Sequence, residues 1–360
     1  MRVFIDLGHP AHVHFYKHLI GNLKRDGHAV QLTARNKEVT HALLTAYGLD
    51  YIDRGSLKKG MSQKALGMLA VDYGMYKIAR QFRPDILMGV HNPYIAHVGK
   101  ALGKPSIIFT DTERVGVASR LTFPFADVIW TPSCFKDPID PKKHVVFNGY
   151  KELAYLHPRY FKPDPGALDR AGVGKGEKFI IVRFISWAAS HDVNLQGISN
   201  EGVAGFVHTL ERYGKVLITS ERQLPPDLEK SRLKIRPEDL HSLLHYSSLY
   251  IGEGGTMATE AAILGTPAIH IESTTGGDAS GLFYGNYREL RDTYDLLHFY
   301  PDEKPALEKA VEILENKDSK QEWQKKRDLL IRDKVDVTGW MTDFVERYPE
   351  SFYEYRRSHA

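Results

Sequence analysis

One segment of the sequence combines the residue types that hold a phosphate. Residues 252–260 read GEGGTMATE and separate an apolar run from a helical pattern. Glycines leave the backbone open to a ligand, and the start of the next helix offers unpaired N–H groups and the positive end of its dipole. We predict a phosphate or diphosphate site built from Gly254, Gly255, Thr256, Met257 and Glu260. The carboxylate of Glu260 could reach a ribose hydroxyl; the alternative is a tight turn with a solvated glutamate. The sequence has neither a Walker A lysine nor a dinucleotide fingerprint after its first strand, which disfavours ATP hydrolysis and NAD chemistry.

A second candidate lies near the N-terminus, where residues 8–14 read GHPAHVH. A histidine at the start of a helix stays neutral, because its charged form is disfavoured there, so it can accept a proton. We predict His12 as the general base, with Gly8, His9 and His14 on the acceptor side. The alternative is a set of structural histidines. No carboxylate or cysteine is patterned to complete a metal site with these histidines, so no metal is predicted.

Polar side chains also follow other apolar runs. Further acceptor-side candidates are His91, Asn92, Asp111 and Glu113. Asp111 is a reserve catalytic base or, alternatively, a helix cap. Further donor-binding candidates are Ser186, Trp187, Arg236 and Asp278. Trp187 could cover a sugar or simply pack, and Asp278 could contact sugar hydroxyls or belong to a mobile surface loop.

The elements that must position these residues alternate along the chain. Strands are predicted at residues 2–7, 29–34, 85–90, 106–110 and 127–131, with helices between them. The rhythm resumes with strands at residues 179–184, 215–219, 233–235, 249–252 and 268–271. Such alternation is typical of parallel sheets covered by helices on both faces. We therefore predict an α/β protein of two Rossmann-like, doubly wound domains facing a cleft, with ligands outside the carboxyl ends of the strands.

Composition narrows the partners and the compartment. A chain of 360 residues suits two domains, and 48 basic against 45 acidic side chains give 48 − 45 = +3, which argues against nucleic acid as a partner. The single cysteine, Cys134, cannot form an intramolecular disulfide and fits a reducing cytoplasm. The chain starts with a strand rather than a signal peptide, and its apolar runs are too short to span a membrane. We expect a cytoplasmic protein.

Three places resemble the GT-B fold of nucleotide-sugar enzymes. Residues 11–13, AHV, resemble the first loop of the N-acetylglucosaminyltransferase that makes lipid II, which puts His12 on the histidine of that family. Residues 147–150, FNGY, resemble its interdomain hinge with glycine and asparagine in reversed order. Residues 254–267 are similar to the donor loop of this transferase and of the non-hydrolysing UDP-N-acetylglucosamine 2-epimerases. The whole chain resembles an uncharacterised prokaryotic family of predicted GT-B glycosyltransferases.

The resemblance implies an organisation and a donor site. It places an acceptor-side domain at residues 1–150, a nucleotide-sugar-binding domain at residues 151–335, and a C-terminal helix and tail at residues 336–360 that pack back on the first domain. The glycines and the helix start would hold the diphosphate of a UDP-sugar, and Glu260 the ribose. The sequence departs from both relatives. The first loop lacks the arginine and glutamate of the epimerases, which disfavours an epimerase. No glutamine pair follows the donor loop as in the transferase, so the identity of the sugar stays open.

The resemblance implies a metal-independent reaction without a cofactor, in which the nucleotide-sugar is a substrate. An acceptor hydroxyl would attack the anomeric carbon, with inversion, while His12 takes its proton. The alternatives are a UDP-N-acetylglucosamine 2-epimerase-like enzyme and a non-catalytic nucleotide-sugar-binding protein. A lipid-linked or glycan acceptor of a cell envelope polysaccharide is the expected partner. Residues 56–69 mix basic and apolar groups that could touch the inner face of a membrane, or form an ordinary amphipathic helix.

Overall fold

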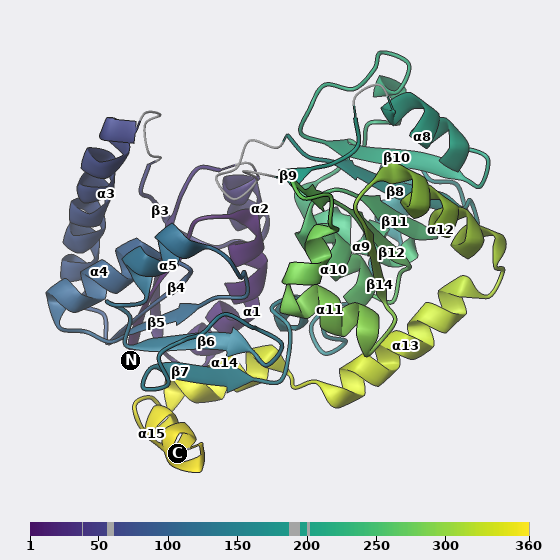
Figure 1. The fold of residues 1–360 in the computed structure, drawn as a ribbon. Coiled ribbons are helices and arrows are strands. Elements are labelled where there is room, and N and C mark those ends of the chain that lie inside the picture. The colour runs from purple at the N-terminus through teal and green to yellow at the C-terminus, as the bar shows by residue number, and fades with distance from the viewer. Residues whose placement is uncertain (38, 56–60, 187–194, 200–201, 360) are drawn as a thin grey trace. The chain divides into compact units, whose positions relative to one another are not determined.

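The structure, a computed structural model, describes residues 1–37, 39–55, 61–186, 195–199 and 202–359 (Figure 1). The chain forms two compact units: Met1–Tyr155 together with Val335–Ala360, and Leu156–Lys334. The boundaries predicted from the sequence lie after residues 150 and 335, close to these divisions. We refer to the two parts as the first unit and the second unit.

The first unit is built on a seven-stranded parallel sheet. Its strand order is β3 (Ile52–Asp53), β2 (Ala29–Ala34), β1 (Arg2–Leu7), β4 (Ile86–Val90), β5 (Ser106–Phe109), β6 (Val128–Pro132) and β7 (His144–Phe147). Its helices are α1 (Pro10–Arg25), α2 (Thr40–Ala46), α3 (Met61–Phe82), α4 (Pro93–Leu102), α5 (Gly116–Thr122), α14 (Val337–Glu346) and α15 (Glu350–Ser358). Helix α6 (Leu153–Leu156) spans the boundary between the units. The central strands are buried runs because helices cover both faces of the sheet.

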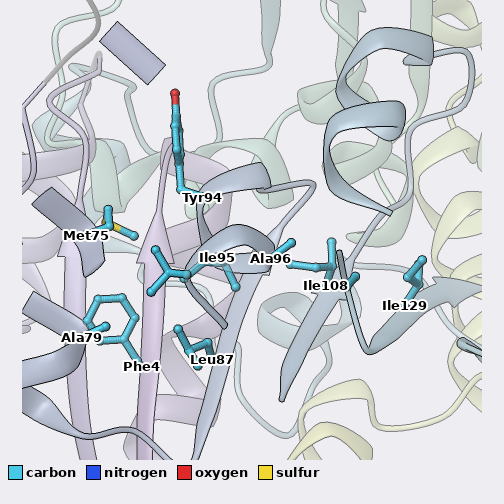
Figure 2. Close-up of a cluster of buried hydrophobic side chains, with 11 residues drawn as sticks. Phe4, Met75, Ala79, Leu87, Tyr94, Ile95, Ala96, Ile108 and Ile129 are labelled. Carbon is cyan, nitrogen blue, oxygen red and sulfur yellow. The ribbon is translucent and has the colours of Figure 1, made fainter. Parts of the chain in front are cut away.

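A cluster of apolar side chains fixes α3 and α4 on one face of this sheet (Figure 2). Phe4 and Leu87 from the strands meet Met75 and Ala79 of α3 and Ile95 of α4, all of them fully buried. This packing sets the position of α4, and therefore of the loop that precedes it at the carboxyl end of β4.

The second unit has a five-stranded parallel sheet. Its order is β10 (Lys215–Ser220), β8 (Phe179–Phe184), β11 (Leu249–Gly252), β12 (Ala268–Ile271) and β14 (Leu297–Tyr300). Its helices are α7 (Gly166–Arg170), α8 (Val203–Leu210), α9 (Leu240–Tyr246), α10 (Gly255–Ile263), α11 (Gly285–Asp292), α12 (Glu303–Glu315) and α13 (Ser319–Asp333), with 3₁₀ turns η1 (Glu229–Ser231), η2 (Pro237–Asp239) and η3 (Ser280–Phe283). A small antiparallel pair joins β9 (Leu195–Gln196) to β13 (Ser273–Thr274). Two parallel sheets with helices confirm the predicted α/β class.

The strand predicted at residues 233–235 is wrong. Arg232 forms a single bridge with Ile218, and the chain then runs without regular structure to η2. The side chain of Arg232 turns back to Glu229 and to the carbonyl of Ser220, so this segment is fixed by side-chain bonds. Five strands were not predicted from the sequence. β7 and β14 extend one edge of each sheet, β3 forms the other edge of the first sheet, and β9 and β13 form the small antiparallel pair. In β7 and β14, buried and half-buried residues alternate, so neither is a continuous buried run, and β3, β9 and β13 have only two residues each.

The last helices complete the first unit. Trp340 of α14 packs against Trp130 and Phe147 at ring distances of 5.0 and 4.8 Å. The hydroxyl of Thr338 donates to the carbonyl of Ala154 at 2.7 Å. Among the described residues, no helix combines the length and apolar character needed to cross a bilayer.

Candidate functional site

The predicted donor loop lies where the central strand of the second unit ends. β11 runs into Glu253 and Gly254, and α10 begins at Gly255. Gly254 has φ +85°, which favours glycine. A Cβ on Gly255 would overlap the hydroxyl of Tyr287, so the missing side chain here makes room for the protein's own tyrosine. Because α10 begins just after β11 ends, the N–H groups of its first turn lie at the carboxyl end of the sheet, where a helix can bind an anion.

Inside this helix, Glu260 is paired with a residue that the sequence did not single out. Its Oε1 lies 3.0 Å from Nε2 of His241 on α9, and both side chains are only 4% exposed. Thr256 and Met257 are half-buried in the first turn, and the Met257 sulfur lies 4.0 Å from the Thr219 hydroxyl. The predicted donor residues of α10 therefore lie together, and His241 orients the glutamate. A pair formed between two helices leaves no local sequence signal.

Glu253 connects the donor loop to two other segments. Its fully buried carboxylate accepts the N–H of Ile185 after β8 and of Ile198 after β9, both at 2.8 Å, and Arg222 Nη2 lies at 3.3 Å. Burial raises the pKa of Glu253 to about 7, against the opposing effect of these donors and of Arg222. Protonation of this carboxyl near neutral pH is thus coupled to the position of the loop.

A cation missed by the sequence reasoning lies beside the start of α10. The side chain of Arg183, at the end of β8, approaches Gly254 and forms an ion pair with Glu221. Ser186, one of the predicted donor residues, donates from its N–H and hydroxyl to the other oxygen of Glu221, at 3.3 and 3.1 Å. Trp187 lies outside the described residues. Arg183 is therefore positioned to meet negative charge at this helix end.

Arg236 and Asp278, two other predicted donor residues, lie outside the contacts described above for α10. Arg236 forms an ion pair with Asp239, Nη2 to Oδ1 at 2.9 Å, and Asp239 also binds Arg170. The bond from Arg170 is the main reason that the pKa of Asp239 falls to about 2. Asp278 is exposed in the turn that follows β13. Within the described residues, neither side chain forms a hydrogen bond or ion pair with α10, so their donor roles stay predictions.

In the first unit, His12 lies in the first turns of α1. Its Nδ1 accepts the N–H of Gly8 at 3.2 Å, so the neutral ring carries its proton on Nε2. Burial, together with the positive charges of Lys151, Lys37 and Arg54, holds the pKa of His12 well below its ordinary value. The ring is therefore neutral because of burial and neighbouring positive charge, and in this arrangement Nε2 carries the N–H that can act as a donor. A base role would require the bond from Gly8 to break.

The other two histidines of this loop make contacts within the first unit. His9 is the N-cap of α1, where its Nδ1 accepts the N–H of Ala11 at 3.2 Å. His14 is buried, stacks on Tyr155 at a ring distance of 5.3 Å, and lies 3.2 Å from the Tyr47 hydroxyl. His14 thus lies on the buried face of α1, and its acceptor-side role stays a prediction.

Asn92 and His91 follow β4. Asn92 is buried: its Nδ2 donates to Asp6 at 2.5 Å, and its Oδ1 caps α4 by accepting the N–H of Ile95 at 3.2 Å. His91 Nδ1 lies 2.8 Å from the Thr110 hydroxyl. Both side chains thus form hydrogen bonds within the protein. Because Asn92 is buried and its amide already bonds to Asp6 and Ile95, direct binding of an acceptor by Asn92 is disfavoured.

Asp111 and Glu113 follow β5. Asp111 Oδ2 pairs with Lys151 at 2.7 Å. Among the described residues, Oδ1 accepts only a long bond from the neighbouring Thr112 hydroxyl, at 3.3 Å. It does not cap a helix. Glu113 is buried and accepts the N–H of Lys136 at 3.2 Å. Lys151 acts electrostatically on His12 and binds Asp111, so the two predicted catalytic residues share a neighbour. Within the described parts of the chain, no three or more His, Cys, Asp or Glu side chains gather as around a metal ion.

Comparison with known proteins places the chain in a family. The profile of a protein family of unknown function, DUF354, matches residues 1–281. The chain belongs to the DUF354 family. A relative of this DUF354 protein is the uncharacterized protein MJ0665 of Methanocaldococcus jannaschii, 25% identical over 285 residues, which cover 74% of this chain and 80% of the relative.

Solved structures show the fold of this DUF354 protein. The UDP-GlcNAc 2-epimerase of Neisseria meningitidis bound to UDP-GlcNAc aligns with 98% of this chain and all of its own, at 12% identity and a TM-score of 0.64. The glycosyltransferase SsfS6 of Streptomyces sp. SF2575 aligns with 96% of this chain and all of its own, at 12% identity and a TM-score of 0.56. The predicted GT-B fold is confirmed. A specific relation to the lipid II transferase is not among these findings.

Proposed function

We propose that this DUF354 protein is a glycosyltransferase that moves a sugar from a nucleotide-diphosphate donor, a UDP-sugar, to a hydroxyl acceptor. The observation that carries the proposal is the start of α10: a glycine turn at the end of a central parallel strand, with a buried glutamate one turn inside the helix. The neighbours with a bound UDP or UDP-GlcNAc share the fold and support the choice of nucleotide.

On the donor side, α10 would hold the diphosphate. Its N–H groups and dipole, with Arg183 beside Gly254, would stabilise the charge that develops as UDP leaves. Glu260, oriented by His241, would accept hydrogen bonds from the ribose. These groups supply the stabilisation without a resident metal ion or cofactor.

On the acceptor side, the geometry reverses the order of the two predicted bases. Asp111 Oδ1 has a single long hydrogen bond, whereas the acceptor nitrogen of His12 is occupied by Gly8. We assign Asp111 as the base and His12 as a neutral Nε2–H donor to the acceptor or sugar. The acceptor oxygen would form a bond to the anomeric carbon, the bond from that carbon to the diphosphate would break, and the proton would pass to Asp111, with inversion.

The alternative function is that of a UDP-GlcNAc 2-epimerase. One observation supports it, the structural similarity of this chain to several UDP-GlcNAc 2-epimerases. Incubation with UDP-N-acetylglucosamine alone separates the two. A 2-epimerase forms a second UDP-sugar without an acceptor, whereas the proposed transferase forms none until an acceptor is added. If the protein bound UDP but formed neither a second UDP-sugar nor a product with any lipid-linked or glycan acceptor, both proposed activities would be contradicted.

The choice of nucleotide is tested by a thermal-shift series with UDP, GDP, CDP and their sugars. We expect a saturable rise in melting temperature with UDP and UDP-sugars, since binding to the folded state alone stabilises it. A larger response to GDP or CDP would contradict the assignment of the base.

A further inference from the structure

Two arginines stand in one row at the carboxyl edge of the first sheet. The register pairs Leu7 with Ala34 and Ala34 with Asp53, so the next residues, Gly8, Arg35 and Arg54, follow three adjacent strands at the same level. The N–H of Arg35 donates to Leu7 and that of Arg54 to Ala34, both at 3.0 Å. Neither arginine was a candidate from the sequence, because the strands that carry them are far apart in the chain.

The guanidinium of Arg54 is buried and held in place. Its side chain is 6% exposed, and Nε donates to the buried carboxylate of Asp6 at 2.7 Å. The group lies over the ring of Tyr94, 5.1 Å from its centroid, and Nη2 points toward Gly8, 3.6 Å from where a Cβ would lie. Among the described residues, neither Nη group has a hydrogen-bond partner. A buried guanidinium with open donors is the arrangement that a planar oxyanion completes.

Arg35 shows the same feature independently. Its Nε is buried and has no partner in the described part of the chain. Burial raises the pKa of Tyr94, while the positive charges of Arg54 and Arg35 act in the opposite direction, so both arginines lie near this ring. Figure 2 shows the Tyr94 hydroxyl directed away from the apolar cluster, and no hydrogen bond to it occurs among the described residues. Three donor side chains, two arginines and a tyrosine, thus lie at one edge of the sheet.

Negative charge within the protein does not account for these donors. Among the described residues, Asp6 is the one carboxylate bound to Arg54, and its two oxygens also accept from Thr33 at 2.7 Å and from Asn92 at 2.5 Å. Lys37 adds positive charge nearby, since it acts on His12 together with Arg54. Two arginines and a lysine match the charge of a phosphate better than that of a single carboxylate.

We propose that Arg35 and Arg54, with Tyr94, bind a phosphate group of the acceptor substrate. The acceptor is then a phosphorylated molecule that offers its hydroxyl to the sugar while these side chains hold its phosphate. The assignment to an acceptor rests on the proposed function, whereas the phosphate site itself belongs to the first unit alone.

The test is calorimetric titration of the full chain with inorganic phosphate and with glycerol phosphate at constant ionic strength. We expect saturable binding, weakened about tenfold or more in Arg35→Gln, because a charge-assisted hydrogen bond is lost. Arg54→Lys keeps the bond to Asp6 within reach but loses the fork, and should weaken binding in the same way. Arg80→Gln, an exposed arginine of α3, is the matched control and should bind as the wild type does.

Three results would overturn the proposal. Phosphate affinity unchanged in Arg35→Gln would place the ion elsewhere, for example at α10. A lower melting temperature in Arg35→Gln with unchanged phosphate affinity would make the arginine structural. If acetate bound as tightly as phosphate, the inferred ligand of the site would be a carboxylate rather than a phosphate. UDP titration of the same variant should match the wild type, so failure of the phosphate site and failure of the donor site are separate outcomes.

Discussion

The carboxyl group of Glu253 makes the stability of the second unit depend on pH. It is fully buried and its pKa is raised from 4.5 to about 7, mainly by loss of hydration. Between these two values the folded state binds more protons than the unfolded state, so stability falls as pH rises through this range. The substitution Glu253→Gln keeps the size of the side chain and removes its titration.

The size of the effect follows from the two pKa values. A change from 4.5 to about 7 corresponds to about 3 kcal/mol, at about 1.4 kcal/mol for each pH unit. This stability is present below pH 4.5 and lost as pH rises to about 7. The amide also leaves one of the two backbone donors, at Ile185 or Ile198, without a carboxylate oxygen, at a cost of about 1–3 kcal/mol that does not change with pH.

Melting curves at pH 5 and pH 8 separate the two contributions. The wild type should lose about 5–10 °C more than Glu253→Gln between these pH values, for a unit of this size. Glu308→Gln, an exposed glutamate of the same unit, should leave the wild-type difference unchanged. An equal pH dependence in wild type and Glu253→Gln would refute the raised pKa and the coupling of this carboxyl to the loop.

Three further experiments test other parts of the structure. Asp111→Asn should lower turnover by about 10²–10⁴, and His12→Gln, which keeps an N–H donor, should lower it less; the opposite order would restore histidine as the base. Asn92→Ala should destabilise the protein by about 1–3 kcal/mol in urea unfolding, since a helix cap and a donor to buried Asp6 are lost, and an unchanged midpoint would show that this network adds no stability. Gly255→Ala should cost about 1–3 kcal/mol through overlap with the Tyr287 hydroxyl, relieved in part by Tyr287→Phe; a stable single variant would mean that the loop rearranges freely.

The sequence predicts the sheets well because their strands are short apolar runs that helices cover on both sides. β1, β2, β8, β11 and β12 have the predicted bounds. The edge strands β7 and β14 were missed because buried and half-buried residues alternate in them, whereas β11 and β12, equally short, are continuous buried runs. The false strand at residues 233–235 shows the reverse error, in which an apolar alternation is held by Arg232 side-chain bonds instead of a ladder.

The candidate site was predictable where one loop contains it and not where distant side chains meet. The glycine turn and Glu260 lie within a single strand–helix connection. His241 comes to Glu260 from another helix, and Arg54 comes to Asp6 across 48 positions of sequence. The tautomer of His12 depends on a backbone N–H of Gly8, which residue types alone do not reveal.

Titration of UDP into the full chain by calorimetry tests the central claim, that α10 forms a nucleotide-sugar site. The account predicts saturable binding of UDP that weakens about tenfold in Glu260→Gln, which retains a hydrogen bond to His241 but loses the charge offered to the ribose, and that is unchanged in Glu308→Gln. Absence of saturable UDP binding to the wild type, or equal affinity in Glu260→Gln, would contradict it.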